Sequence, residues 1–385
     1  MKTEHIKEKI DKKRILIIST VSRQFYLFEK LNIRLLTELG WSVHCAANFE
    51  DQSSELDGLP IIRHQIDFKR SPFSISNIRA FFQLYKVIQQ NNINLIHCHS
   101  PVGGAVGRLV SLFFPRVRTI YTAHGFHFYK GAPVLNWLVY YPLELLLSKI
   151  TDALITINKE DFNRGFFFFS KKTFYVPGIG VNLNKFSTKK SVEENTKFRK
   201  ELKLNRDSIL FLSIGELIPR KNLETAIIAF SKLENKNTHF LICGKGELSN
   251  PLIQLVINFD LRERVHFLGF RKDIPYIIRN CDVFVFPSFQ EGLPVSLMEA
   301  MACGLPIICS QIRGNVDLLD NNIGGFLIKP NDILSFTNAM SKLYEDEGLR
   351  YKMGANNINR MESFSENAVG SIMRDIYISQ EIYLS

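Results

Sequence analysis

The chain has 385 residues, of which 45% are hydrophobic and 22% are charged, and its formal net charge is +10. This length allows two domains that each bury a core, and the composition is ordinary for a globular protein. The positive charge suits a polyanion, an anionic membrane surface or a phosphorylated substrate, and it does not choose between them. The sequence contains no nucleic-acid recognition module, so we expect no nucleic-acid partner.

Cysteine usage and apolar segments indicate the cellular compartment of the protein. Six cysteines are scattered through apolar patterns without C-x-x-C or zinc-site spacing, so we expect reduced thiols in the cytoplasm. Residues 1–14 are charged throughout and lack the apolar stretch of a signal peptide. The longest apolar region, 132–147, contains Asn136, Pro142 and Glu144 and is shorter than the roughly 20 residues of a membrane-spanning helix. We therefore expect a protein that is soluble or bound to a membrane surface.

The first half of the chain alternates strand and helix patterns. Apolar residues such as Ile78, Phe81 and Tyr85 recur at helical spacing and predict an amphipathic helix over 76–90. Short apolar strands that alternate with helices are typical of a doubly wound α/β domain. The predicted strands of this half are 14–20, 42–47, 94–97, 119–122, 153–157 and 173–176.

The composition changes near the middle of the chain. Residues 187–207 are rich in Lys and Glu and poor in large apolar side chains, which indicates a domain boundary. A second α/β series follows this boundary, with helices expected near 222–233 and 250–258. Its predicted strands are 209–213, 240–243, 265–268 and 283–286.

The end of the chain carries one more helical pattern. Val369, Ile372, Met373 and Ile376 stand at i, i+3, i+4 and i+7 and predict a terminal amphipathic helix. We expect, in chain order, a first domain, a charged linker, a second domain and a terminal helix that packs back on the first domain. The corresponding ranges are 1–183, 184–207, 208–363 and 364–385.

The segment 282–309 holds two carboxylates that its local pattern does not explain. An apolar strand is followed by a polar loop, a short helix from Pro294 to near Gly304, and another strand, which is the repeating unit of a parallel α/β sheet. Glu291 lies in the loop at the start of the helix. Glu299 lies within the helix, among apolar residues.

Six motifs occur in order along the chain: IHCHSPVGG, YTAHGFHF, PGIGVN, GELIPRKN, CGKGEL and SFQEGLPVSLMEAMACGLP. Together with E-x₇-E, here Glu291 and Glu299, they closely resemble the retaining family-4 glycosyltransferases of the GT-B fold over nearly the whole chain. The RSPF, HCHSPVGG and TAHGFHFYKGAP segments most resemble transferases of bacterial exopolysaccharide and capsule assembly. The resemblance implies two Rossmann-like doubly wound domains that face each other across a cleft. The second would bind a nucleotide sugar and the first an acceptor.

The resemblance also implies roles on the donor side. Glu299 would accept hydrogen bonds from the ribose hydroxyls, because a carboxylate offers acceptors to two adjacent donors. Glu291 would contact hydroxyls of the transferred sugar. The backbone N–H groups of Gly292 and Leu293 would approach the sugar or diphosphate, at a helix start that favours an anion. The alternatives are that Glu299 is a solvent-facing helix glutamate and that Glu291 is an ordinary loop acid.

The phosphate clamp of the family reads G-R-x₄-K, and this chain departs from it. Gly215 opens the segment and Lys221 aligns with the clamp lysine, which would neutralise charge on the β-phosphate. The arginine position is Glu216 instead. Arg220 is a candidate for the missing cation. Alternatively, Arg220 and Lys221 are a solvated pair before a helix.

Two further loops are assigned to the nucleotide by resemblance. Gly244 follows a strand in CGKGEL, where the family borders the nucleotide, although a tight turn is the default reading of a lone G-x-G. Arg271 lies in the loop 270–272, where backbone groups of the family read the base.

The acceptor side is expected in the first domain. The family places a histidine that corresponds to His124 beside the transferred sugar. His99 and His127 are weaker candidates, because a strand-end histidine is more often a structural hydrogen-bonding group. Gly103 and Gly104 would allow a close approach of the chain to the sheet or to the substrate.

No D-x-D and no His, Asp or Glu cluster with metal-ligand spacing occurs, so we expect no metal cofactor.

The family implies retention of anomeric configuration. Because no covalent nucleophile is evident, we favour front-face displacement, with a UDP-linked sugar as donor and a polyprenyl-diphosphate-linked saccharide as acceptor. The alternatives are a nucleotide-sugar epimerase of the same fold and a non-catalytic nucleotide- or glycan-binding protein.

Such an acceptor places the protein peripherally at the cytoplasmic face of the plasma membrane. Three segments that combine basic and apolar residues could dock on anionic lipid: the N-terminus, 107–118 and 164–172. The alternative for the last segment is that the phenylalanines at 166–169 belong to the core.

Overall fold

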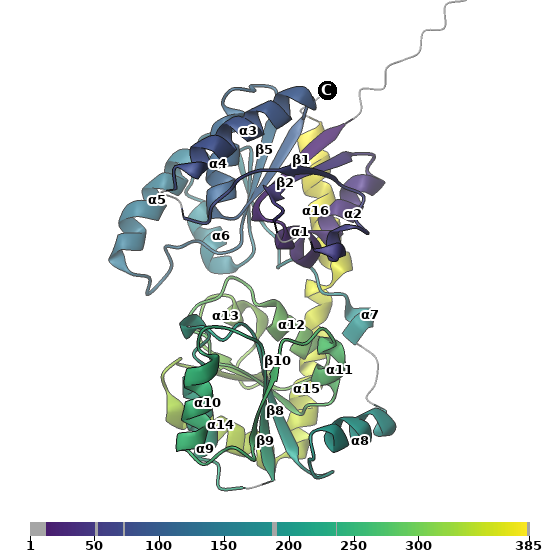
Figure 1. Ribbon diagram of the computed structural model, residues 1–385, viewed down its shortest axis with the longest axis vertical. Coiled ribbons are helices and arrows are strands. Elements are labelled where there is room, and N and C mark those ends of the chain that lie inside the picture. Colours follow the sequence, from purple (N-terminus) through teal and green to yellow (C-terminus); the bar gives the residue numbers. More distant parts are fainter. Residues whose placement is uncertain (1–12, 51–52, 72–73, 187–190, 236, 383–385) are drawn as a thin grey trace, which may run out of the picture. The chain divides into compact units, whose positions relative to one another are not determined.

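A computed structural model describes residues 13–50, 53–71, 74–186, 191–235 and 237–382 of the chain. The chain forms two compact units, unit 1 (Met1–Ile179 and Gly370–Ser385) and unit 2 (Gly180–Val369). Each unit contains one parallel sheet with helices on both faces (Figure 1). The second boundary between the units, after Val369, lies within the last helix, α16 (Glu366–Glu381), so the larger part of α16 belongs to unit 1.

The sheet of unit 1 has seven parallel strands in the order β3-β2-β1-β4-β5-β6-β7. Helices cover both of its faces, so the central strand β1 contains a continuous apolar run; Ile15, Leu16 and Ile17 are fully buried. The strands are β1 (Arg14–Val21), β2 (Ser42–Asn48), β3 (Ile62–Gln65), β4 (Leu95–His99), β5 (Arg118–Ala123), β6 (Ala153–Thr156) and β7 (Lys172–Tyr175).

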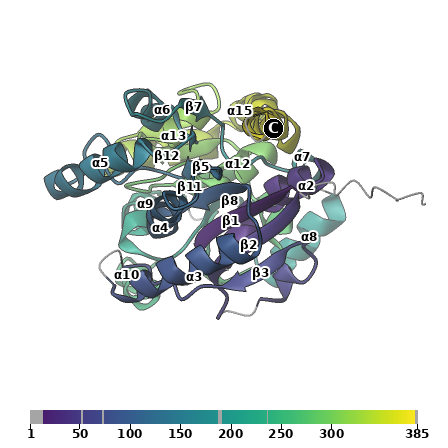
Figure 2. The same cartoon turned by 90° about the horizontal axis from the view of Figure 1, so that it is seen from above.

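The helices of unit 1 divide between the two faces of this sheet. The helices α3 (Ser76–Gln90), α4 (Pro101–Ser111) and α5 (Val134–Ser148) lie on one face. On the other face lie α1 (Arg23–Phe28), α2 (Lys30–Glu38) and α16 (Figure 1). Figure 2 shows α3 and α4 side by side. The unit also contains α6 (Lys159–Gly165) and a 3₁₀ turn, η1 (Ser54–Leu56).

Glycines let α4 lie close against the sheet. A Cβ atom on Gly104 would lie 2.5 Å from Cε2 of Tyr121, and one on Gly103 would lie 3.3 Å from the backbone of Thr20. Pro101 begins the helix, where its missing N–H group has no partner to lose. Gly103 and Gly104 therefore serve the packing of α4 on the sheet.

The sheet of unit 2 has six parallel strands in the order β10-β9-β8-β11-β12-β13. One of its hydrophobic clusters is rich in large side chains, among them Phe211, Phe230, Phe240 and Phe336. The strands are β8 (Ile209–Ile214), β9 (Thr238–Cys243), β10 (Val265–Gly269), β11 (Val283–Phe286), β12 (Ile307–Ser310) and β13 (Gly325–Ile328).

Helices surround this second sheet (Figure 1). The short helix in the segment 282–309 begins at Val295, one residue after the predicted start at Pro294. The helices are α7 (Leu183–Phe186), α8 (Val192–Glu201), α9 (Leu223–Ser231), α10 (Ser249–Asn258), α11 (Ile274–Arg279), α12 (Val295–Ala302), α13 (Asn315–Leu318), α14 (Ile333–Glu345) and α15 (Glu347–Met361), with 3₁₀ turns η2 (Pro219–Lys221) and η3 (Glu362–Phe364).

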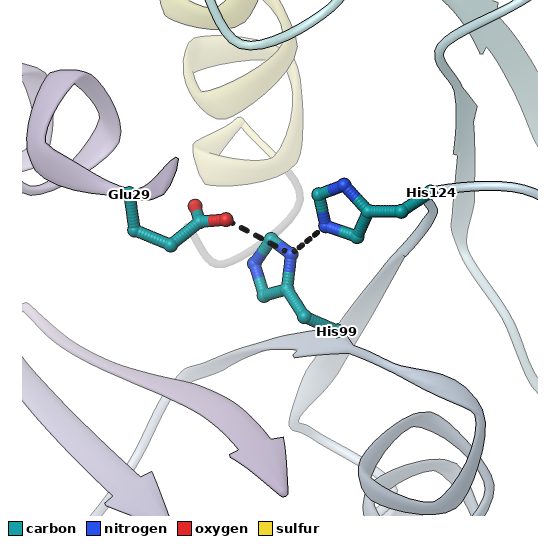
Figure 3. A group of neighbouring side chains, drawn as sticks. All are labelled: Glu29, His99 and His124. Atoms are coloured by element: carbon teal, nitrogen blue, oxygen red, sulfur yellow. Dashed lines mark hydrogen bonds and ion pairs between the residues drawn. The ribbon is translucent and has the colours of Figure 1, made fainter. Parts of the chain in front are cut away.

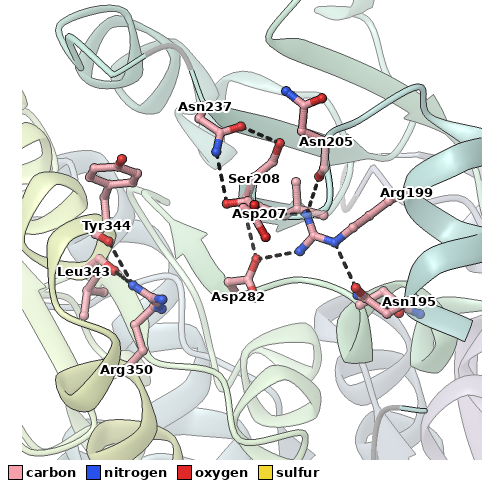
Figure 4. A network of polar contacts seen from close by, with 12 residues as sticks. Asn195, Arg199, Asn205, Asp207, Ser208, Asn237, Asp282, Leu343, Tyr344 and Arg350 are labelled. Carbon is pink, nitrogen blue, oxygen red and sulfur yellow. Dashed lines mark hydrogen bonds and ion pairs between the residues drawn. The ribbon is translucent and has the colours of Figure 1, made fainter. Parts of the chain in front are cut away.

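The segment 184–207 is not the simple charged linker that its composition predicts. It contains α8, in which Phe198 and Arg199 are buried. Nη1 of Arg199 donates a 2.7 Å hydrogen bond to the carbonyl oxygen of Ser208, and Nη2 lies 3.4 Å from Oδ2 of Asp282 (Figure 4). These two buried side chains anchor α8 to unit 2, while the Lys and Glu residues that dominate the composition cover its outer surface.

The sequence predicts the regular elements unevenly. The helix predicted over 76–90 is confirmed as α3. Strands β3 and β13 were not predicted; both are edge strands, β3 is mostly exposed, and β13 begins at a glycine. The apolar region 132–147 is mostly one helix, α5, which continues through Pro142. Within the described residues, no helix has both the length and the apolar character needed to cross a membrane.

Candidate active site

Two loops of unit 2 meet where its strand order reverses. Strands β8 and β11 are neighbours, whereas β9 and β12 lie on opposite sides of them, and α/β proteins bind ligands at such switch points. The loop after β8 contains Asn222, whose side chain donates a 3.0 Å hydrogen bond to the carbonyl oxygen of Pro287 in the loop after β11. The backbone N–H of Phe289 donates to the carbonyl oxygen of Arg220 at 2.9 Å. The two loops are therefore tied together.

The carboxylate of Glu291 is buried between two cations. Its Oε1 atom lies 2.8 Å from Nζ of Lys221 and 3.0 Å from Nη1 of Arg220. The same Nη1 donates a 2.6 Å hydrogen bond to the carbonyl oxygen of Gln290. Arg220 and Lys221 are thus not a solvated pair, and Glu291 is not an ordinary loop acid. The two cations in direct contact outnumber this carboxylate, which suits an anionic ligand, and Glu216 is a second acid that acts on Lys221.

Burial sets the electrostatics of Lys221. Desolvation lowers the pKa of Lys221, and the nearby carboxylate of Glu291 partly opposes this effect. The ammonium group also lies 4.6 Å from the ring centroid of Phe286, within the range of a cation–π contact. Glu216, at the position of the family's arginine, is exposed. The second cation that contacts the carboxylate of Glu291 beside Lys221 is Arg220.

Glycines allow the loops of this site to approach each other. A Cβ atom on Gly215 would lie 3.2 Å from Cε of Lys221, so the lysine side chain runs along this glycine. Gly244 has φ +152°, and a Cβ there would lie 1.8 Å from the carbonyl oxygen of Gly215. No residue with a side chain fits at Gly244 without moving one of the two loops.

Arg313 holds the other side of the Glu291 loop, and sequence reasoning missed it. The side chain is buried and follows β12, and its Nε atom donates a 3.2 Å hydrogen bond to the carbonyl oxygen of Glu291. The next residue, Gly314, has φ +83°, and a Cβ there would lie 2.2 Å from the carbonyl oxygen of Gly292. The available signal was an arginine–glycine pair directly after a predicted strand. Leu293, next to Gly292, is buried.

Glu299 and Arg271 lie outside this cluster of contacts. Glu299 is half-buried on α12, and burial raises its pKa to about 7, while Lys185 acts in the opposite direction. Arg271 donates two hydrogen bonds, of 2.8 and 2.6 Å, to the carboxylate of Asp273. Arg271 is therefore engaged within its own loop.

Unit 1 has a cavity of about 570 Å³ at the carboxyl ends of β1, β4 and β5. Of the residues expected on the acceptor side, His127 lines this cavity, and its ring stacks on Tyr140 at a centroid distance of 4.6 Å. Two exposed arginines, Arg23 and Arg70, also line it. The apolar part of the lining comes mainly from Val102, Val106, Leu109, Phe126, Phe128 and Leu143.

His99 and His124 join a buried glutamate next to this cavity (Figure 3). Nδ1 of His99 lies 3.2 Å from Oε1 of Glu29 and 3.0 Å from Nε2 of His124. Burial raises the pKa of Glu29 to about 7 and lowers the pKa of His124 to about 4. The pKa of His99 is also lowered by burial. Glu29 was not predicted, because it lies between two helices in a segment without any functional motif.

The comparisons with known proteins agree along the whole chain. Residues 14–158 match the family described as glycosyl transferase 4-like, and residues 194–360 match glycosyl transferases group 1. The chain is 35% identical over 371 residues to EpsD of Bacillus subtilis (strain 168), covering 95% of this chain and 96% of that one. This chain belongs to the family-4 glycosyltransferases.

A second relative of this transferase has a name that states its donor, its acceptor and the linkage it forms. It is the UDP-Gal:alpha-D-GlcNAc-diphosphoundecaprenol alpha-1,3-galactosyltransferase of Escherichia coli, 34% identical over 318 residues that span 80% of this chain and 81% of the relative. Another, from Campylobacter jejuni, is an N,N'-diacetylbacillosaminyl-diphospho-undecaprenol alpha-1,3-N-acetylgalactosaminyltransferase, 26% identical over 94% of this chain and 98% of that one.

Solved structures show that the transferase has the GT-B fold. Anabaena Alr3699/HepE in complex with UDP and glucose superposes with a TM-score of 0.79 at 18% identity, covering 95% of this chain and 100% of that one. The sucrose-phosphate synthase of Thermosynechococcus elongatus superposes with a TM-score of 0.80 at 20% identity, covering 96% and 99% of the two chains.

The Glu29, His99 and His124 group of the transferase has the ligand types of a metal site. Their potential ligand atoms all lie within 4.8 Å of one another. The side-chain N–H group of Gln24, however, lies 2.9 Å from Oε1 of Glu29 and 3.1 Å from Nε2 of His124. A hydrogen-bond donor directed at two of the three ligands opposes a cation there. The group fits a hydrogen-bonded cluster better than a metal centre.

Proposed function

We propose that this transferase moves a hexose or N-acetylhexosamine from a UDP-sugar to a polyprenyl-diphosphate-linked saccharide during exopolysaccharide or capsule assembly. The observation that carries the proposal is the buried Glu291 carboxylate held by Lys221 and Arg220 at the switch point of unit 2. The named substrates of the Escherichia coli and Campylobacter jejuni relatives support the acceptor, and the UDP bound to Alr3699/HepE supports the nucleotide.

The donor chemistry follows from the charges of this site. Lys221 and Arg220 would stabilise negative charge that develops on the β-phosphate as the sugar departs, which is the largest electrostatic contribution expected. Glu291 would accept hydrogen bonds from hydroxyls of the sugar, Glu299 would accept them from the ribose, and the backbone of Gly292 and Leu293 would approach the diphosphate.

We further propose that transfer retains the anomeric configuration by front-face displacement and needs no divalent ion. The departing phosphate oxygen would accept the proton of the acceptor hydroxyl while the new glycosidic bond forms on the same face of the sugar. Undiminished turnover in excess EDTA supports the metal-free reaction, and restoration of lost turnover by Mg²⁺ or Mn²⁺ contradicts it. Proton NMR of the anomeric centre in the product distinguishes retention from inversion.

The cavity of unit 1 is the proposed acceptor site. Its apolar lining suits isoprenoid or sugar-ring carbons, and Arg23 and Arg70 match the negative charge of the diphosphate. His127 lines the same cavity, and His124 lies in the loop that borders it, where we propose that it contacts the transferred sugar. The structure offers these groups for an amphiphilic, anionic acceptor.

An exposed apolar surface of unit 1 supports docking on a membrane, where a lipid-linked acceptor would be found. Of the phenylalanines at 166–169 only Phe168 is buried; Phe166, Phe167 and Phe169 are 70%, 77% and 57% exposed, so three of the four do not belong to the core. The neighbouring α5 exposes Val134, Leu135, Leu138 and Leu146, and the end of α4 exposes Leu109, Leu112 and Phe113.

Cations flank this apolar surface, which makes it suited to anionic lipid. Arg116, Lys149, Lys171 and Lys172 are exposed, and Nζ of Lys149 lies 5.1 Å from the ring centroid of Phe169. Of the three predicted docking segments, most of the N-terminal one lies outside the described residues. We propose that the other two, 107–118 and 164–172, dock together with α5 on the cytoplasmic face of the plasma membrane.

Flotation with phosphatidylglycerol-containing liposomes tests the docking. We expect binding at low salt that decreases when Leu135 and Leu138 are both replaced by Ser, and a matched double change at Ile253 and Phe259, exposed on and just after α10 of unit 2, should have no effect. A wild-type protein that remains wholly unbound contradicts the docking surface.

A nucleotide-release assay with and without a lipid-linked acceptor tests the function itself. We expect UDP release only when acceptor and sugar donor are both present. Conversion of the UDP-sugar without acceptor would identify an epimerase. Binding without turnover would identify a non-catalytic protein. A preceding screen of UDP-Glc, UDP-Gal, UDP-GlcNAc and UDP-GalNAc for thermal stabilisation identifies the donor, because a ligand that binds only the folded state raises the unfolding temperature.

A further inference from the structure

Hydrogen-bond donors and acceptors fix the protonated nitrogen of each histidine in the Glu29 cluster. The side-chain nitrogen of Gln24 can only donate, so Nε2 of His124, 3.1 Å away, must accept. A neutral imidazole carries its proton on one nitrogen, and the proton of His124 therefore lies on Nδ1. Figure 3 shows Nδ1 on the side of the ring that points away from His99.

The same reasoning applies to His99. Its Nδ1 lies between Nε2 of His124 and Oε1 of Glu29, which are both acceptors, so Nδ1 of His99 carries the proton. Its other nitrogen, Nε2, is buried without a hydrogen-bond partner among the described residues, as expected for the unprotonated nitrogen. The tautomers assigned to the two rings are thus mutually consistent.

Glu29 determines which groups of this cluster donate hydrogen bonds and which accept them. Its Oε1 accepts from Gln24 at 2.9 Å, and its Oε2 accepts from Asn32 at 2.7 Å. Burial raises the pKa of Glu29 to about 7, so the carboxylate is ionised above that pH. The ionised carboxylate forces Gln24 to present its N–H group rather than its oxygen, and it forces His99 to present Nδ1–H. Both of these donors lie within hydrogen-bond distance of Nε2 of His124, which therefore carries no proton.

The surroundings keep the rings neutral. His97 packs against His99 at a ring-centroid distance of 4.2 Å, and burial lowers the pKa of His97 to about 3. The hydroxyl oxygen of Tyr377 of α16 lies 3.0 Å from Nδ1 of His97, and Tyr377 and Cys45 also experience the charge of Glu29. With the pKa values of the three histidines all lowered, no imidazolium competes with the hydrogen-bond order described above.

We propose that Gln24 and Glu29 are positioning residues that hold His124 as its Nδ1–H tautomer, so that Nδ1 donates a hydrogen bond to a hydroxyl or ring oxygen of the transferred sugar. The proposal rests on the proposed function for the identity of the ligand. The tautomer itself follows only from the contacts of the free protein. Because a neutral donor at a fixed position does not change its protonation state when the sugar arrives, it is preorganised for the transition state.

Ring-nitrogen NMR of the full chain tests the tautomers without any substrate. Deuterated protein with ¹⁵N-labelled histidine gives long-range proton–nitrogen correlations that distinguish Nδ1–H from Nε2–H, and His99→Gln and His124→Gln assign the signals. We expect both rings as Nδ1–H in the wild type above about pH 7, where Glu29 is mostly ionised. In Glu29→Gln the amide can donate to Nδ1 of His99, so we expect both rings to lose the Nδ1–H preference.

Steady-state kinetics test whether the tautomer of His124 affects sugar transfer. We expect Glu29→Gln to lower kcat about tenfold with a smaller change in KM for the UDP-sugar. Gln24→Met, at a half-buried position, keeps the side-chain volume and should give a smaller loss in the same direction. Glu38→Gln makes the same chemical change on the neighbouring helix α2, in a surface ion pair with Arg374, and should leave the histidine signals and kcat unchanged.

Several outcomes overturn the proposal. His124 observed as Nε2–H in the wild type does so, as does a Glu29→Gln protein that is folded and keeps wild-type tautomers and kcat. Stoichiometric shifts of the His99 and His124 signals on addition of Zn²⁺ would instead identify a metal site. Absence of sugar transfer in every form, with the expected tautomers present, would contradict the proposed function and leave the tautomer assignment standing.

Discussion

Nζ of Lys221 lies 2.8 Å from Oε1 of Glu291, although the two residues are 70 positions apart in the chain. The contact joins the loops that follow β8 and β11, and it places a cation and a buried carboxylate at the switch point of one sheet. Because Arg220 approaches the same carboxylate oxygen, the pair is not neutral as a unit. The two cations in direct contact with Glu291 outnumber this one carboxylate, and Glu216 also acts on the charge of Lys221.

Removal of either partner should abolish most of the turnover. We expect Lys221→Ala and Glu291→Ala each to lower kcat by about a hundredfold or more, because each removes a group that we propose to act on the developing charge or on the transferred sugar. Steady-state kinetics with the donor that the thermal screen identifies provides the measurement. Lys232→Ala and Glu234→Ala, both at exposed positions of unit 2, are matched controls. Wild-type turnover in both site variants would refute the site assignment.

Nucleotide affinity should depend on pH through Glu299. Its pKa of about 7 means that the carboxylate is mostly protonated at pH 6 and mostly ionised at pH 8, and the ionised form is the better acceptor for ribose hydroxyls. We therefore expect UDP to bind more tightly at pH 8 than at pH 6. Titration calorimetry with Glu299→Gln should show weaker binding, and the pH dependence that remains should be that of UDP itself. An identical pH profile in both proteins would show that Glu299 does not contact the nucleotide.

The raised pKa of Glu299 also makes the free energy of unfolding depend on pH. The pKa of Glu299 in the folded protein lies above its ordinary value of 4.5, so ionisation of this group disfavours the folded state. Its contribution to the free energy of unfolding is fully present below about pH 4.5 and is lost as the pH rises through about 7. A bound nucleotide that donates to the carboxylate should offset this loss.

Gly314→Ala should displace the loop that carries Glu291. The substitution places a Cβ 2.2 Å from the carbonyl oxygen of Gly292 at φ +83°, so backbone must move. We expect a loss of about 2 kcal/mol or more in the free energy of unfolding, measured in urea, together with weaker UDP binding. Gly348→Ala is the matched control, because the nearest atom to its Cβ is 3.4 Å away and its φ is not positive. Equal stability of the two variants would contradict the steric argument.

A buried ion pair beneath the cavity of unit 1 gives a further stability prediction. Arg108 makes hydrogen bonds of 2.8 and 3.0 Å to the two carboxylate oxygens of Glu144, and its guanidinium lies 3.8 Å from the ring centroid of Tyr121. Arg108→Met leaves the buried Glu144 without its partner, and we expect a loss of about 3–5 kcal/mol in the free energy of unfolding.

The double variant of this pair is the decisive comparison. Arg108→Met with Glu144→Leu removes both charges and should recover most of the loss, because the penalty arises from one uncompensated buried charge. Arg374→Met breaks an exposed ion pair with Glu38 and should cost less than about 1 kcal/mol. Equal losses for Arg108→Met and the double variant would show that shape, rather than charge, decides the stability of this position.

Local patterns in the sequence determined the elements and part of the site. Apolar runs such as the one at Ile15, Leu16 and Ile17 are strands because a parallel sheet covered on both faces needs a continuous apolar sequence. The helical spacing over 76–90 gave α3 at its observed bounds. Glu291 and Glu299 stood out because each is an acid in a segment whose remaining pattern is apolar or turn-like.

Only the tertiary structure decided which distant groups meet. Glu29, His99 and His124 come from three separate segments of unit 1, and Arg313 reaches Glu291 from the end of another strand. Composition suggested a linker where α8 is anchored by Arg199, since two buried side chains hardly change an average over many charged ones. Periodicity reports the environment of one element, whereas such contacts depend on how the parallel strands are ordered in each sheet. That order brings the carboxyl ends of strands remote in the sequence to one edge, and it assembled both proposed sites.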